Sequence, residues 1–239
     1  MTDSPPITLE WNMSKRETTG RKTIDSSAPI ADGEWCMRPN AEKIPCPALL
    51  SFYNNGRLKP DKDGNVTTGH LDDVLASVGV SKMVRRVLVK GADKTDEIPQ
   101  SFNLFELRGS SLDHSGSTGI RDQRVSPEKL ESSLLRFSES GRMYVEHFAA
   151  AANQAQSQDP GFKGTMIQTV EFTALLEVFG RLDESKRRYL TVEDVRGLWI
   201  DGKYPKDWQP RPANDIGVGS VMAGVAVMAV KRLWKSIGF

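Results

Sequence analysis

Apolar residues recur along this chain at the three- and four-residue spacing of a helix face. Segments 70–80 and 82–89 show this spacing, and 143–152 and 164–179 also read as helices. The pattern predicts that helices dominate the fold.

Two further helices are indicated by the residues that begin them. Ser126, Pro127 and Glu128 provide an N-cap, a proline at the first helical position and an acid in the first turn. Thr191 stands in a similar place before the segment that ends near residue 200. Strand signals are scarce, because no alternating run of β-branched residues occurs and no Asn-Gly or Asp-Gly turn joins two such runs. We therefore predict an all-α fold.

The distribution of polar residues divides the chain into three parts. Residues 1–33 are rich in Ser, Thr and Pro without a period, which predicts a flexible arm. Residues 34–212 form the predicted single helical domain, and 213–239 a C-terminal apolar helix. Its segment 216–230 lacks charge but is shorter than the roughly 20 residues of a spanning helix. It is either packed on the domain or associated with a membrane.

Composition narrows the functional classes. The 239 residues carry 32 basic and 31 acidic side chains, and this balance gives no electrostatic reason to expect nucleic acid as a partner. Two cysteines are too few for a disulfide framework. The N-terminal residues lack the basic start and apolar stretch of a signal peptide, so we expect an intracellular protein.

Cys46 has the sequence context of a reactive thiol. Pro47 suits the first position of a helix, which makes Cys46 the N-cap. The amides of Ala48 and Leu49 and the positive end of the helix dipole would then favour a thiolate, the form that binds metal. For Pro-Cys-Pro alone, an inert buried cysteine is the more common case. Cys36 lacks the helix start, and we expect it to be structural.

The residues around Cys46 resemble a known family. The segment 45–67, PCPALLSFYNNGRLKPDKDGNVT, is similar to the Pro-Cys-Pro-Ala-Leu motif, the Asn-His-Gly turn and the helix-starting Thr of the fungal chloroperoxidases and unspecific peroxygenases. The turn here reads Asn54-Asn55-Gly56, without the histidine. The resemblance covers roughly residues 35–211. It implies an all-helical domain that binds haem b through Cys46 and uses hydrogen peroxide to oxidise, oxygenate or halogenate a small organic substrate.

The same resemblance implies a second metal. Residues 112–117, LDHSGS, occupy the place of the family's Glu-His-Asp-x-Ser motif. Asp113, the main chain of His114 and Ser117 would thereby bind Mg²⁺ or Mn²⁺ beside a haem propionate, with the oxygen ligands that hard cations prefer. Asp113 is shorter than the family's glutamate by one methylene, and Ser115 replaces its second acid.

Glu177 is the predicted acid–base catalyst. It shares a helix face with Val170 and Ala174, where a carboxylate is costly unless it is protonated or paired. Residues 172–177 resemble the distal helix of the family, whose glutamate moves the proton of the peroxide. One subgroup pairs that glutamate with an arginine at the position of Val170 here. The other uses the histidine of Glu-His-Asp, which implies His114 as the partner of Glu177.

Two other interpretations remain. A haem protein of the same fold would catalyse a non-redox step or only bind a ligand, and activity with peroxide and a simple phenol separates it from a peroxidase. A calcium-binding module is suggested by 61–65, DKDGN. Aligning Gly64 with the invariant sixth position of an EF-hand puts Lys59 first and His70 twelfth, where acids are needed. A purified protein without a Soret band would favour such a binding module.

Overall fold

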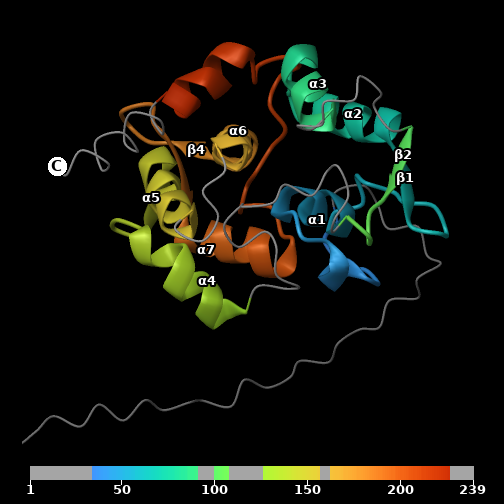
Figure 1. Cartoon of the computed structure of the whole chain (residues 1–239), viewed down its shortest axis with the longest axis horizontal. Coiled ribbons are helices and arrows are strands. Elements are labelled where there is room, and N and C mark those ends of the chain that lie inside the picture. The colour runs from blue at the N-terminus through green and yellow to red at the C-terminus, as the bar shows by residue number, and fades with distance from the viewer. Residues whose placement is uncertain (1–33, 91–99, 108–125, 157–161, 227–239) are drawn as a thin grey trace, which may run out of the picture.

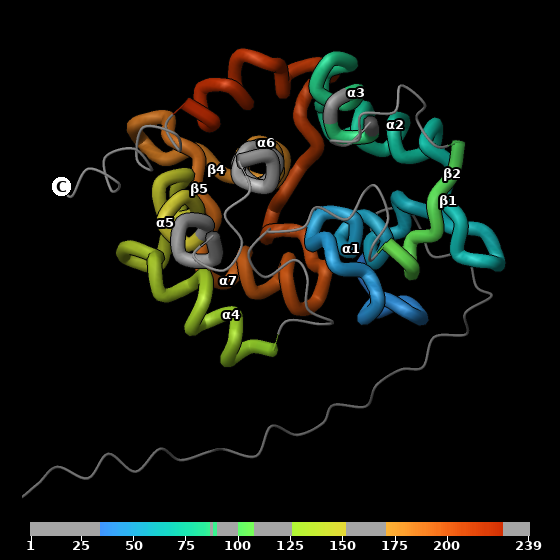
Figure 2. The backbone as a smooth tube through the Cα atoms, in the orientation of Figure 1, coloured from blue at the N-terminus to red at the C-terminus, as the bar shows by residue number. Residues whose placement is uncertain are grey.

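A computed structural model describes residues 34–90, 100–107, 126–156 and 162–226 of the chain (Figure 1). Helices dominate this described part. The longest of them, α6, runs through the centre, and the backbone tube shows it end-on with the other helices around it (Figure 2). Most side chains in the C-terminal half of α6 are buried, and they form part of the hydrophobic core.

The α-helices follow the predicted segments closely. They are α1 (Pro47–Asn54), α2 (Thr68–Ser77), α3 (Lys82–Lys90), α4 (Pro127–Ser133), α5 (Val145–Gln156), α6 (Phe162–Phe179) and α7 (Val192–Arg196), with a final helix at 218–226. The 3₁₀-helices are η1 (Ala41–Lys43) and η2 (Leu135–Phe137), and a π-helical turn, η3 (Gly197–Asp201), extends α7. The N-caps predicted at Ser126 and Thr191 are confirmed, since each side chain accepts a backbone N–H of its first turn.

The prediction of an all-α fold is wrong, because two small antiparallel sheets are present. β1 (Asn65–Thr67) pairs with β2 (Ser101–Asn103), and β5 (Arg188–Thr191) lies between β3 (Arg142–Tyr144) and β4 (Arg181–Leu182). The fold is therefore mixed, with helices in the majority.

The sequence pattern does not indicate the strands, because each is only two to four residues long. Such a length shows at most one cycle of alternation, so the pairing is decided by contacts between distant segments. Met143 of β3 stands opposite Leu190 of β5, and both side chains are fully buried. Because β3 runs directly into α5 and β5 into α7, this pairing also fixes where those two helices begin.

The Asn-Asn-Gly turn attaches α1 to the end of η3. Asn54 Nδ2 donates to the carbonyl of Asp201 at 2.8 Å, and Asn55 Nδ2 donates to the carbonyl of Gly202 at 3.0 Å. Both asparagines are buried, so these bonds satisfy groups that water cannot reach. Gly202 has φ +60°, and a Cβ there would lie 2.7 Å from Leu50 Cγ, which requires glycine at this crossing.

Residues 216–226 pack on the domain. Ile216 is fully buried and pairs with Val80, with its N–H donating to Gly79 and its carbonyl accepting from Ser81. Gly224 in the helix 218–226 lies against Thr173 of α6. Within the described residues, no helix has the length and apolar character that crossing a membrane requires.

Candidate functional site

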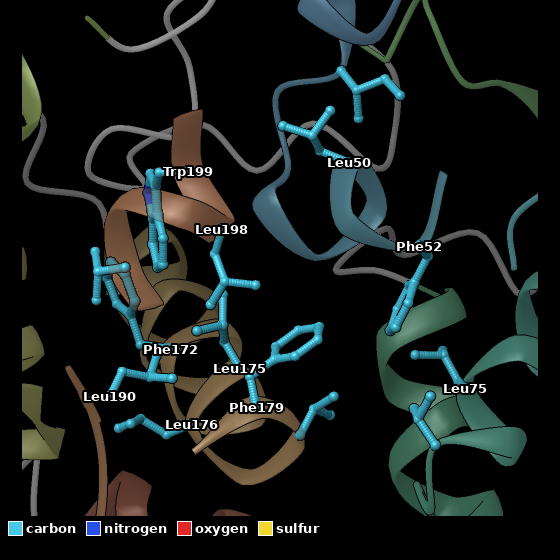
Figure 3. Packing of buried hydrophobic residues seen from close by; sticks show 14 of the residues in the cluster. Leu50, Phe52, Leu75, Phe172, Leu175, Leu176, Phe179, Leu190, Leu198 and Trp199 are labelled. Carbon is cyan, nitrogen blue, oxygen red and sulfur yellow. The ribbon is translucent and has the colours of Figure 1, made fainter. Parts of the chain in front are cut away.

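An apolar hollow lies between the central helix α6 and the helices α1, α2 and α3. Its volume is about 140 Å³. The larger apolar side chains that line it are Phe52, Leu71, Leu75, Leu88, Leu107, Phe172, Leu175, Val178 and Phe179. Figure 3 shows Phe52 of α1 and Phe179 of α6 turned toward one another. Among the described lining residues, only Cys46 and Glu171 carry polar side chains. We call this hollow the Cys46 cavity.

Cys46 is the N-cap of α1, as the sequence predicts. Its backbone is extended (φ −84°, ψ 120°), and Pro47 occupies the first turn. Burial raises the pKa of Cys46 to about 11, and the charge of Glu171 adds to that rise. The amides of Leu49 and Ala48 act in the opposite direction but do not prevail. The helix start therefore does not ionise the sulfur by itself, and a coordinated cation would be needed to deprotonate it at neutral pH.

Glu171 is the acid that sequence reasoning missed. It lies on the same face of α6 as Leu175 and Val178, at the helical spacing of four and seven residues, and all three line the Cys46 cavity. Its side chain is half-buried. The helical period counted from Glu171 indicates this face of α6. The resemblance instead indicates Glu177, the last acid of the helix.

Glu177 does not line the Cys46 cavity. Its Oε2 accepts a hydrogen bond from Arg188 Nε at 2.8 Å and another from Arg211 Nη1 at 2.7 Å. Its side chain is 14% exposed, so this is a mostly buried carboxylate between two guanidinium groups. The arginines are 11 and 34 residues away in sequence, which helical spacing cannot show. The free-energy cost of burying the Glu177 carboxylate on an apolar helix is thus offset by its two ion pairs.

Asp113, His114 and Ser117 lie outside the described residues, so the Mg²⁺ or Mn²⁺ site and the pairing of His114 with Glu177 remain predictions. In the described ranges, no three His, Cys, Asp or Glu side chains are grouped in a way that would hold a metal ion. The 61–65 loop closes on itself, since Asp61 Oδ1 accepts the N–H groups of Asp63 and Asn65. At its far end, His70 Nε2 accepts the N–H of Lys59.

The Cys46 cavity offers part of the chemistry that a haem would use. Cys46 is a soft sulfur donor suited to iron, and Glu171 provides a carboxylate in a lining that is otherwise apolar. The volume of about 140 Å³ is below the roughly 300–1,000 Å³ typical of ligand sites. The described residues therefore supply a thiol and a carboxylate, in a space smaller than a haem occupies.

No protein-family model matches this chain, and a search among curated proteins finds no match either.

Proposed function

We propose that this protein is a haem-thiolate peroxidase or peroxygenase that acts on a small organic substrate with hydrogen peroxide. The observation that supports the proposal is the meeting of Cys46 and Glu171 in one apolar cavity, although they are far apart in sequence. A cysteine at a helix start and an acid within a helix are each common. A thiolate ligand and a proton carrier would need to lie in one space lined by aliphatic and aromatic side chains, and Cys46 and Glu171 do so.

Cys46 would hold the haem iron through its sulfur, in a cavity that would have to widen to admit the group. The amides of Ala48 and Leu49 stabilise negative charge on that sulfur, and coordination would complete its deprotonation. A haem held in this way would supply a centre at which peroxide is activated, because a thiolate ligand donates electron density that favours O–O cleavage. The leucines and phenylalanines of the wall exclude water from the reacting groups.

Glu171 would be the proton carrier. A carboxylate with apolar neighbours such as Leu175 and Phe172 can take the proton from one oxygen of hydrogen peroxide and deliver it to the other. This role replaces the one expected for Glu177, whose carboxylate is occupied by Arg188 and Arg211 outside the cavity.

A haem-binding experiment tests the proposal. The full chain is purified with added haem, and the spectrum of its ferrous carbon monoxide complex is recorded. We expect the red-shifted Soret band of thiolate ligation, its loss in Cys46→Ala, and its retention in the matched variant Cys36→Ala. The oxidation of a simple phenol by hydrogen peroxide then tests the peroxidase activity. A protein that takes up no haem, or a band that survives Cys46→Ala, would contradict the proposal.

A further inference from the structure

The helix 218–226 has an outer side without charged residues. Its inner side packs on α6, and Val221 on that side is buried. The outer side carries Val218, Met222 and Ala226, which are exposed and follow one another at intervals of four residues. The helix contains no acid or base at all. A surface helix normally presents charged or polar side chains to water, so this outer side indicates an interaction surface.

The start of α3 lies beside this uncharged helix. Val80 and Ile216 form a parallel bridge, and each of the two helices begins two residues after it. Figure 2 shows them next to each other along one edge of the molecule. The first turns of α3 expose Lys82, Met83 and Arg86. Met83 is 68% exposed, more than any other large apolar side chain in the part of the chain that the structure describes.

The two bases on this side of α3 are not neutralised by ion pairs. In the described ranges, Lys82 and Arg86 pair with no acid, whereas Arg85 pairs with Asp72 at 2.9 Å. Asp73 is an exposed acid on α2, the helix packed against α3, so bases outnumber unpaired acids here. Exposed apolar and basic side chains therefore lie together. We call this surface the Met222 face, and its residues are Lys82, Met83, Arg86, Val218 and Met222.

An anionic lipid surface is the partner that matches this combination. Basic side chains are attracted to the negative headgroups, and apolar side chains gain free energy by leaving water for the boundary between headgroups and acyl chains. Because the uncharged helix packs on α6 by its inner side, its outer side can lie in the plane of that boundary. The sequence that follows has the same character, since residues 227–239, VMAVKRLWKSIGF, contain Lys231, Arg232 and Lys235 but no acid.

We propose that the Met222 face docks this protein on an anionic lipid membrane. The apolar side chains of the face would enter the headgroup layer, while Lys82 and Arg86 contact the negative groups of the lipids. The attraction is electrostatic in part, so binding should weaken as salt screens the charges. The inference goes beyond the proposed function and does not rest on it, because the Cys46 cavity takes no part in the binding.

Sedimentation with lipid vesicles tests the basic part of the face. The full chain is mixed with vesicles of phosphatidylcholine alone, or of phosphatidylcholine with about one quarter of anionic phosphatidylserine, and we expect about tenfold tighter binding to the second. The double variant Lys82→Ala with Arg86→Ala should bind the anionic vesicles about 25-fold more weakly, since one base near such a surface contributes about fivefold. Both positions are exposed in a helix, where alanine is readily accepted.

Met222→Glu tests the apolar part of the face. It places a negative charge at a side chain that is 51% exposed, and it should weaken binding to the anionic vesicles by about tenfold or more. Leu182→Glu is the matched control, because Leu182 of β4 is 54% exposed and the same charge is introduced in another element. This control should leave binding within about twofold. Circular dichroism of all variants checks that each is folded.

Three results would overturn the inference. The first is no binding to the anionic vesicles, the second is equal binding to neutral ones, and the third is unchanged binding in both the double variant and Met222→Glu. A dimer in analytical ultracentrifugation that Met222→Glu dissociates would assign the face to a second copy of the chain instead. Haem uptake is measured without vesicles, so its failure would contradict the proposed function and leave this inference standing.

Discussion

Glu171 in the middle of α6 and Cys46 at the start of α1 are electrostatically coupled across the cavity that they line. The negative charge of Glu171 adds to burial in raising the pKa of Cys46 to about 11. A cation bound at the sulfur would reverse this relationship, because the same carboxylate would then stabilise positive charge near the thiolate. In the proposed function, the pair would therefore favour a positively charged group bound at the sulfur.

The choice between the two glutamates can be tested with peroxide. If Glu171 carries the proton, Glu171→Gln should lower the rate of peroxide consumption by about 10²–10⁴-fold, the usual range for general acid–base catalysis. Glu177→Gln should lower it by less than about tenfold, because Glu177 lies outside the cavity. Stopped-flow spectra of the haem-loaded variants measure both rates. The reverse order would restore Glu177 as the catalyst.

The stability of the haem-free protein should fall in alkali because of Cys46. Burial raises the pKa of this thiol from 9.0 in an unfolded chain to about 11 in the folded protein. Between these values the unfolded state binds fewer protons, so the free energy of unfolding decreases as pH rises, by about 3 kcal/mol at most. Urea unfolding from pH 8 to about 11 measures this slope.

The Cys46 contribution is isolated by comparing variants. Cys46→Ala should show a shallower loss of stability above pH 9 than the wild-type chain, whereas Cys36→Ala should retain the wild-type slope. The tyrosines and lysines are the same in all three proteins, so their contributions cancel in the comparison. Equal slopes in all three would show that Cys46 is not held as a buried thiol.

Two glycines in the helix 218–226 should respond oppositely to alanine. A Cβ at Gly224 would lie 2.4 Å from Thr173 Cγ2, whereas a Cβ at Gly219 meets nothing within 4 Å. Gly224→Ala should therefore lower the free energy of unfolding by about 1–3 kcal/mol, the cost of overpacking. Gly219→Ala should raise it by about 0.5–1 kcal/mol through helix propensity. Equal effects in urea unfolding would mean that this helix does not pack on α6 in solution.

Removing the carboxylate of Glu177 should destabilise the fold. Glu177→Ala leaves Arg188 and Arg211, 17% and 20% exposed, without their shared partner. We expect a loss of about 2–3 kcal/mol, somewhat less than for a fully buried pair. Glu193→Ala removes an exposed acid that pairs with Arg196 and should cost less than about 1 kcal/mol. Similar losses in both variants would rule out a structural role specific to Glu177.

The sequence by itself determined the helices and the position of Cys46. The spacing of apolar residues and the caps at Ser126 and Thr191 are local signals, because helical hydrogen bonds join residues four apart. Pro47 likewise identifies Cys46 as an N-cap without reference to the rest of the chain. These features were predicted because the physics that produces them acts within one or two turns.

Only the tertiary structure decided which residues meet. The pairing of Met143 with Leu190 and the ion pair of Arg211 with Glu177 join segments that are far apart in sequence. The same is true of Glu171 and Cys46, which share a cavity only because α1 packs beside α6. Contacts of this kind depend on how helix faces and strand edges fit together in three dimensions. A one-dimensional pattern shows that Glu171 and Glu177 are both acids on a helix, but not which one faces the cavity.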